Sequence, residues 1–161
     1  MKKRQSKSAA RRSGPAVLDL DDYFPYWLAS LSRLLIQRLQ VRLEKETGLT
    51  IAEWRLMAVV ACNRDAQAID ISKLTRLDQV AVHRAVKALM ARRLLRREEY
   101  ADDKRRKLLR LTAEGWSVYD RVLPAAREIE RDLLDLMTAS ERKSLRKLLG
   151  DLYRKAKNEA L

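Results

Sequence analysis

Two short helical segments joined by a brief turn constrain the fold more than any other part of this sequence. Asp70 is expected to cap the first segment, and Leu77 and Asp78 are expected to form the turn. A second helix is predicted over residues 79–93, because apolar residues recur there at helical spacing. These apolar residues are Val82, Val86 and Leu89. The pattern is that of a helix-turn-helix, although other small helical bundles show similar spacing.

The second of these helices has a polar and basic outward face, made by Gln79, His83, Arg84 and Lys87. In the major groove of DNA, glutamine suits adenine and arginine suits guanine. We therefore expect these four side chains to contact DNA bases or phosphates. The competing interpretation is an ordinary solvated helix surface.

Residues 94–100 and 107–112 contain no helix breaker and predict the two strands of a β-hairpin. Between them, residues 101–106 combine two aspartates with three consecutive bases and are expected to form the tip. By itself this stretch would pass for a solvated surface turn. Its position after a basic helix instead favours a second element that contacts DNA.

Longer amphipathic helices are predicted on both sides of this region. Residues 21–46 carry apolar residues at helical spacing, and Gly48 is expected to end that helix. The other helices are expected to begin at threonine caps, which are Thr50 (with Glu53), Thr112 and Thr138 (with Glu141). Because the chain has only 4 glycines and 3 prolines, we expect it to be mainly α-helical.

The positive charge is concentrated in two places. The formal net charge is +13; residues 1–14 hold six bases and no acid, and residues 73–110 hold thirteen bases against five acids. Strong positive charge favours nucleic acid or an anionic membrane as partner. Residues 1–20 are interpreted as a disordered basic arm.

Several features indicate the compartment. The single cysteine, Cys62, excludes an intramolecular disulfide and fits a reducing cytosol, so we expect a cytoplasmic protein. No apolar run approaches the roughly 18 residues that span a bilayer. The basic N-terminus lacks the apolar region of a secretory signal, although residues 1–14 alone stay compatible with a mitochondrial-type presequence. Cys62 is expected to be a small buried apolar residue rather than a redox sensor.

Neither catalysis nor a cofactor is expected. The sequence contains no nucleophile–base pair, no glycine-rich phosphate loop and no carboxylate pair in a plausible cleft. His83 is the only histidine, and one histidine without neighbouring acids or cysteines does not make a metal site.

Taken together, the order of elements resembles the MarR (multiple antibiotic resistance regulator) family of winged helix-turn-helix transcription factors. The match covers about residues 22–157. It is carried by three pieces, which are Gly48-Leu49-Thr50 through Glu53-Trp54-Arg55, His83-Arg84 through Leu89, and Asp103-x-Arg105 followed by Leu111-Thr112 and Gly115. One departure is that the position before the hairpin, often glycine in the family, is Leu94 after Arg93.

The resemblance implies a fold that is mainly α with a small β-wing. It places a winged helix-turn-helix lobe at residues 48–112 and a helical dimerisation region at residues 21–47 and 113–161. It also implies a homodimer that offers two such lobes to double-stranded DNA. A symmetric dimer predicts a pseudo-palindromic operator with half-sites about one helical turn apart.

In the wing, the resemblance implies that Arg105 enters the minor groove, which attracts arginine where it is narrow. Asp103 is expected to hold the Arg105 guanidinium in its inserted geometry by accepting a hydrogen bond. Lys104 and Arg106 would contact phosphates and carry no sequence information. On the helix before the wing, Arg84 occupies the matching position of the family's recognition helix.

The family's effector pocket lies between the dimerisation helices and the DNA-binding lobe and often takes aromatic carboxylates. Four of the nine aromatic residues fall within residues 23–27, where they could plug a dimer interface or form one wall of that pocket. The predicted effector contacts are Tyr23, Tyr26, Trp27, Ser30, Arg33 and Trp54. Some of these pieces resemble the branch that controls aromatic-acid breakdown, in which the effector is the free acid or its coenzyme A thioester.

The sequence therefore predicts a ligand-responsive regulator, expected to repress transcription, that acts on DNA and not on a membrane. An aromatic acid or its acyl-CoA thioester is expected to release it from DNA. The alternative is an architectural protein that binds nucleic acid without sequence preference.

Overall fold

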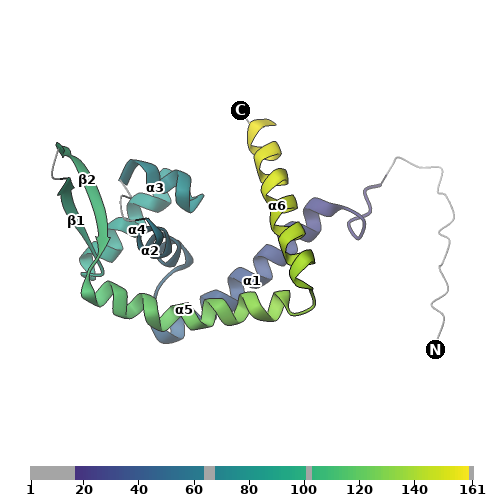
Figure 1. The fold of residues 1–161 in the computed structure, drawn as a ribbon, viewed down its shortest axis with the longest axis horizontal. Coiled ribbons are helices and arrows are strands. Elements are labelled where there is room, and N and C mark those ends of the chain that lie inside the picture. The colour runs from purple at the N-terminus through teal and green to yellow at the C-terminus, as the bar shows by residue number, and fades with distance from the viewer. Residues whose placement is uncertain (1–16, 64–67, 101–102, 160–161) are drawn as a thin grey trace. The chain divides into compact units, whose positions relative to one another are not determined.

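The structure is a computed structural model that describes residues 17–63, 68–100 and 103–159, with the backbone alone described at residues 68–70, 100 and 103–107. Along these residues, helices come first, one β-hairpin follows, and further helices end the chain (Figure 1). The elements in order are α1 (Phe24–Glu46), α2 (Ile51–Cys62), α3 (Ala68–Thr75), α4 (Gln79–Ala91), β1 (Leu95–Tyr100), β2 (Asp103–Leu111), α5 (Ala113–Leu134) and α6 (Ala139–Glu159). This is the mainly helical fold with a small β-wing that the sequence predicted.

The chain divides into two compact units, residues 1–33 and residues 34–161, and the division falls within α1. The first unit contributes the start of α1, where the Trp27 indole N–H donates to the Asp21 carbonyl over 2.8 Å. The second unit contains the helix-turn-helix, the hairpin and both C-terminal helices. In that unit the hairpin and α2 to α4 gather at one end of α5, and α6 follows from the other end (Figure 1).

Local caps set the helix boundaries, as predicted. The Thr50 hydroxyl accepts from the Glu53 N–H, while the Glu53 carboxylate accepts from the Thr50 N–H over 2.8 Å. Thr112 caps α5, and Thr138 forms a second capping box before α6. Each cap satisfies backbone N–H groups that the first turn of a helix leaves without partners.

The core of the second unit is built around α2, which packs against α3, α4, α5 and β2. On this helix, Trp54 and Met57 are buried. Leu56 and Val60 are buried as well, so α2 is enclosed on more than one side. A helix that is apolar around most of its circumference is expected at the centre of a lobe. On α4, the predicted core residues are confirmed as buried; they are Val82, Val86 and Leu89.

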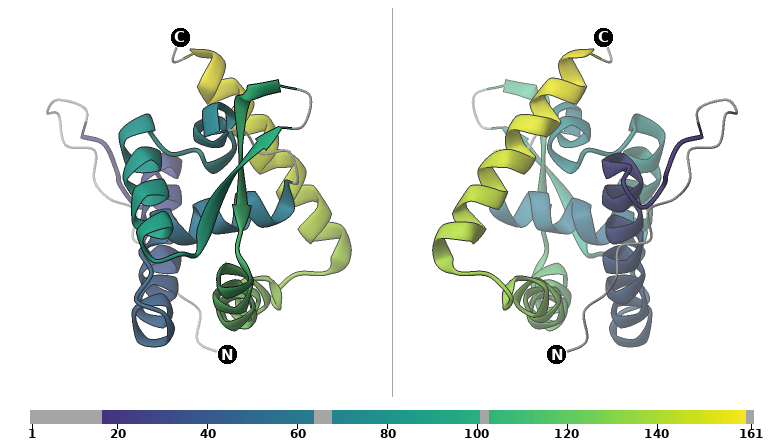
Figure 2. Two further views of the ribbon diagram at one scale, coloured as in Figure 1. Left: turned by 90° about the vertical axis from the view of Figure 1, so that its left-hand side faces the viewer. Right: turned by 90° about the vertical axis from the view of Figure 1, so that its right-hand side faces the viewer.

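The hairpin pairs β1 with β2 antiparallel, with Leu95 opposite Leu111 and a register break between Glu99 and Tyr100. Figure 2 shows the two strands crossing in front of the helices. The strand β2 begins at Asp103, whereas residues 101–106 were expected to form the tip. Strand β2 therefore includes residues whose turn propensity would have placed them in the tip. Pairing between the two strands, and not side-chain type alone, decides where a strand begins.

The turn before the hairpin includes Leu94, the position at which the sequence departs from the family pattern. Arg93 adopts a φ of 55°, a left-handed conformation that favours glycine, and Leu94 follows it. The Arg93 carbonyl accepts from the Thr112 hydroxyl over 2.7 Å, and the Leu94 carbonyl accepts from the Thr112 N–H over 3.2 Å. These bonds join the start of the hairpin to the start of α5.

The cap prediction at Asp70 is wrong. Helix α3 begins at Ala68, so Asp70 lies inside the helix, and an N-cap residue must have non-helical backbone. The prediction that Cys62 is buried is also wrong, because its side chain is exposed at the last residue of α2. A helix end has a solvent-facing side even when the rest of the helix is enclosed.

Candidate nucleic-acid interface

The turn between α3 and α4 sets the direction of α4. Arg76 has a φ of 55° and ends the first helix. Asp78 then caps α4, and its carboxylate accepts from the Ala81 N–H over 2.7 Å. This fixes the first turn of α4, which is the part of a recognition helix that meets base edges in known helix-turn-helix proteins.

The four residues predicted to contact DNA on α4 are all exposed; they are Gln79, His83, Arg84 and Lys87. They lie opposite the buried face of α4. Gln79, His83 and Arg84 share the wall of a hollow of about 530 Å³. The structure therefore brings three of the four together, and Lys87 lies one turn further along the helix.

Three residues that the sequence analysis did not name also line this hollow. Ser72 comes from α3, Val80 from α4 and Arg97 from β1. Arg97 lies opposite Leu109 in the hairpin register, and its place in the lining of the hollow brings it beside α4. The hollow thus brings together cationic groups from a helix, α4, and from a strand, β1.

The wing carries its own internal ion pairs. The Arg110 Nε donates to the Glu98 carboxylate over 3.1 Å, and Arg96 pairs with the same carboxylate. Glu98 therefore pairs with two of the basic strand residues. At the tip, the side chains predicted to act lie outside those that the structure describes; they are Asp103, Lys104, Arg105 and Arg106.

A hydrogen-bonded bridge ties α4 to the end of α1. The guanidinium of Arg92, the C-cap of α4, donates to the Thr47 carbonyl over 2.6 Å and to the Gly48 carbonyl over 3.2 Å. Gly48 has a φ of 63° and closes α1, as predicted, through its N–H bond to the Leu43 carbonyl. Because α4 carries the candidate DNA contacts, this bridge couples their position to α1.

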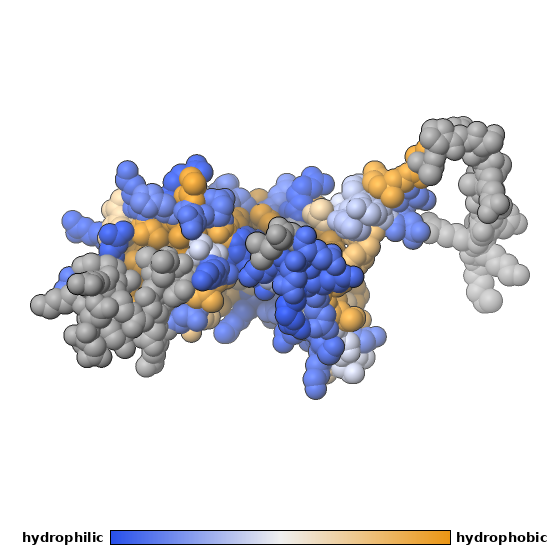
Figure 3. Space-filling view, turned by 90° about the horizontal axis from the view of Figure 1, so that it is seen from above, coloured by the Kyte–Doolittle hydropathy of each residue, from blue (hydrophilic) through white to orange (hydrophobic). Residues whose placement is uncertain are grey.

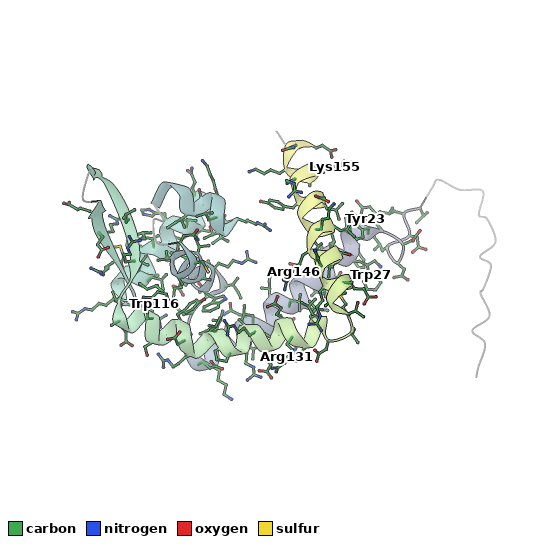
Figure 4. All side chains as sticks on the ribbon, viewed as in Figure 1. Tyr23, Trp27, Trp116, Arg131, Arg146 and Lys155 are labelled. Carbon is green, nitrogen blue, oxygen red and sulfur yellow. The ribbon has the colours of Figure 1, made fainter. Side chains whose placement is uncertain are left out.

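The residues predicted to contact an effector fall in both units of the chain. Tyr23, Tyr26 and Trp27 are exposed at the start of α1, where Figure 4 labels Tyr23 and Trp27. The Tyr26 and Trp27 rings meet edge to face with centroids 6.5 Å apart. Ser30 and Arg33 follow on the same helix. These five residues belong to the first unit and are described with it alone.

Trp54 belongs to the core of the second unit. It is 7% exposed and stacks on Tyr119 of α5 with ring centroids 5.2 Å apart. Trp116, near the hairpin end of α5, meets the Tyr119 ring edge to face at 5.6 Å (Figure 4). Burial raises the pKa of the Tyr119 hydroxyl, and the neighbouring Cys62 acts in the same direction. This cluster of aromatic rings was not predicted, because α2 and α5 are remote in sequence.

Among the residues that the structure describes, no group of histidine, cysteine and acidic side chains is placed to hold a metal ion. None of the helices in the same part of the chain is long and apolar enough to cross a membrane.

With this geometry in place, comparison with known proteins is informative. Residues 47–106 match the model of the MarR family. The matched segment contains α2, α3, α4, β1 and the start of β2, which are the elements that form the candidate interface. No curated protein sequence matches the chain.

Solved MarR-type structures share the fold over most of the chain. A MarR/EmrR family transcriptional regulator from Acinetobacter sp. ADP1 is 26% identical, with a TM-score of 0.80, and the match covers 88% of this chain and 99% of that one. CouR from Rhodococcus jostii RHA1, solved with p-coumaroyl-CoA, is 18% identical with a TM-score of 0.77, covering 84% and 95% of the two chains. MepR from S. aureus, solved with DNA, is 19% identical with a TM-score of 0.73, covering 83% and 98%. The chain therefore has the MarR-type winged helix fold, and the Acinetobacter protein that shares it is named as a transcriptional regulator.

Proposed function

We propose that this chain is a MarR-family transcriptional regulator that binds a pseudo-palindromic DNA operator as a homodimer, most simply as a repressor in the cytoplasm. The observation that carries the proposal is the exposed face of α4, where Gln79, His83 and Arg84 line one hollow with Arg97 of the wing. Cationic and amide side chains on one helix face suit both the phosphates and the base edges of DNA. The same segment matches the MarR family model.

The residues divide by role under this proposal. Gln79 and Arg84 read bases in the major groove, and His83 and Lys87 contact bases or phosphates. Arg105 enters the minor groove and is held there by Asp103, while Lys104 and Arg106 contact phosphates. Phosphate contacts fix the register of the protein on DNA, and base contacts decide the sequence.

Exposed apolar side chains on the outer helices support a homodimer. On α6 three leucines face solvent; Leu148, Leu149 and Leu152 are 57%, 42% and 44% exposed. On α1, Leu31 and Leu34 are also exposed. Figure 3 shows hydrophobic patches that reach the surface between hydrophilic side chains. Contiguous apolar helix faces left open in one chain indicate an interface, and the two-fold symmetry of a dimer matches a palindromic operator.

An aromatic carboxylate, or an aromatic acyl-CoA thioester, is the proposed effector. The exposed aromatic residues at the start of α1 offer flat apolar walls with polar tips, and Ser30 and Arg33 follow on that helix to hold a carboxylate. CouR, which shares the fold, was solved with p-coumaroyl-CoA. The effector releases DNA by binding more tightly to a dimer whose two lobes are wrongly spaced.

The DNA-binding half of the proposal is tested by selecting duplexes from a random pool with the full chain and footprinting the winner. The expected result is one protected sequence with two related half-sites about one helical turn apart. A ladder of uniform protection, or no enrichment, would instead support the architectural alternative. The effector half is tested by thermal shift with aromatic acids and their thioesters, because a ligand that binds the folded state raises the melting temperature.

A further inference from the structure

Val80 is an exposed valine in the first turn of α4 that the fold itself does not explain. Its side chain is 62% exposed, while the apolar residues on the other side of α4 are buried. Valine is not a strong helix former, because its branched Cβ restricts the side chain against the preceding turn. Neither packing nor helix propensity therefore accounts for a valine at this position.

The surroundings of Val80 combine cationic and apolar side chains. It lies one turn before His83 and Arg84 on the same helix face, since residues three and four apart are neighbours on a helix. The side chains of all three residues line the hollow of about 530 Å³ that Arg97 also lines, together with the buried Val82 and Val86. Val80 is thus an exposed apolar side chain beside cationic groups.

This position selects one chemical partner. The first residues of a recognition helix approach base edges in the major groove. The apolar group that a base presents there is the C5-methyl of thymine, and apolar side chains contact it. We propose, on the basis of the function proposed above, that Val80 reads the C5-methyl of a thymine in each half-site of the operator.

The adjacent residue agrees with this assignment. Gln79 precedes Val80, and glutamine bonds to the N6 and N7 atoms of adenine. A·T base pairs carry both groups, adenine on one strand and the thymine methyl on the other. The two residues together therefore specify A·T pairs at the part of each half-site that meets the start of α4.

The experiment replaces single thymines of the selected operator by deoxyuridine, symmetrically in both half-sites. Deoxyuridine keeps the base pair and removes only the methyl group. At one thymine per half-site, the unaltered chain should lose affinity about fourfold per half-site, which is ~0.8 kcal/mol at 1.36 kcal/mol per tenfold. The Val80→Ala variant should show a smaller loss at that thymine, because alanine offers less apolar surface to the methyl group, and Val80→Ile should keep the loss.

Val17→Ala serves as the control, because Val17 is an exposed valine, at 89%, outside both the winged lobe and the helical dimerisation region. Its response to deoxyuridine should equal that of the unaltered chain. Thermal melting of Val80→Ala should match the unaltered chain, since the removed methyl groups are exposed.

Two results overturn the proposal in different ways. If the chain selects an operator but Val80→Ala and the unaltered chain respond alike to every thymine replacement, the assignment of Val80 is wrong and the DNA-binding function stands. If the chain selects no sequence at all, the proposed function fails, and the methyl contact fails with it.

Discussion

The guanidinium of Arg76 lies over the ring of Tyr153, with 4.0 Å between the guanidinium carbon and the ring centroid. Arg76 ends α3 at the turn of the helix-turn-helix, and Tyr153 belongs to α6. This cation–π contact therefore joins the turn that aims α4 to the C-terminal helix, which we propose takes part in dimerisation. Under the proposed function, a change at the proposed dimer face would have a direct physical route to the proposed DNA-binding lobe.

Replacing Tyr153 by alanine should lower the free energy of unfolding by about 0.5–1 kcal/mol, the value of an exposed cation–π pair. Tyr153→Phe is the matched control, because phenylalanine keeps the ring face and loses only the hydroxyl. Urea denaturation of the two variants measures the difference. Equal losses in both variants would show that the ring face contributes nothing.

Gly115 should not tolerate alanine. A Cβ at this position would lie 2.0 Å from the backbone carbonyl oxygen of Leu94, so either α5 or the hairpin must move. We expect Gly115→Ala to cost about 3 kcal/mol or more, at the upper end of the range for overpacking. The measurement is denaturant unfolding, with far-ultraviolet circular dichroism to detect loss of the fold.

Gly150 in α6 provides the opposite case. A Cβ there would approach Arg154 no closer than 3.6 Å, which is ordinary contact. Gly150→Ala should therefore raise the free energy of unfolding by about 0.5–1 kcal/mol, because alanine is the better helix former. If Gly115→Ala and Gly150→Ala both raised the free energy of unfolding, the close packing that the structure gives for Gly115 would be contradicted.

The raised pKa of Tyr119 predicts an alkaline weakness. Burial favours the neutral hydroxyl, so the folded chain keeps its proton at a pH where the unfolded chain has begun to lose it, above the ordinary value of 10.0. Because the unfolded state then binds fewer protons, stability falls as the pH rises from that value through the folded pKa.

Tyr119→Phe removes this contribution and keeps the ring that stacks on Trp54. Its free energy of unfolding should fall less steeply above about pH 10 than that of the unaltered chain. The other tyrosines and the lysines titrate in both proteins, so their effect on the two slopes is the same. Urea unfolding at a series of alkaline pH values measures the two slopes. Parallel curves would mean that Tyr119 titrates alike in both states.

The wing residues make separable predictions on operator binding. Arg105→Ala should weaken binding by about 1–3 kcal/mol at matched salt, whereas Lys104→Ala should mainly reduce the salt dependence, by about one unit of slope if it contacts one phosphate. Arg131→Ala is the charge-matched control, since Arg131 is exposed on α5 outside the lobe (Figure 4). Unchanged affinity in Arg105→Ala would refute the minor-groove role.

Features decided within one helical turn were predictable from the sequence. The threonine caps at Thr50, Thr112 and Thr138 and the buried face of α4 needed only local spacing. Features decided by pairing between distant segments were not predictable. The start of β2 depends on the strand register, and the stacking of Trp54 on Tyr119 depends on how α2 meets α5.

The candidate site shows the same division. The outward residues of α4 follow from helical period, whereas Arg97 enters the hollow only because the hairpin folds back beside α4. Val80 was overlooked for another reason. Helical periodicity assigns apolar residues to the buried face, so an exposed valine is not expected from the sequence. Only the structure shows that Val80 is exposed and available to a partner.

The central claim, sequence-specific recognition of DNA, is tested most directly by one titration. Binding of the full chain to its selected operator and to a scrambled duplex of equal length is measured by fluorescence anisotropy at one fixed, near-physiological salt concentration. The account predicts that the operator binds at least about 10³-fold more tightly than the scrambled duplex. Equal affinities for the two duplexes would contradict the account and identify a protein that binds DNA through charge alone.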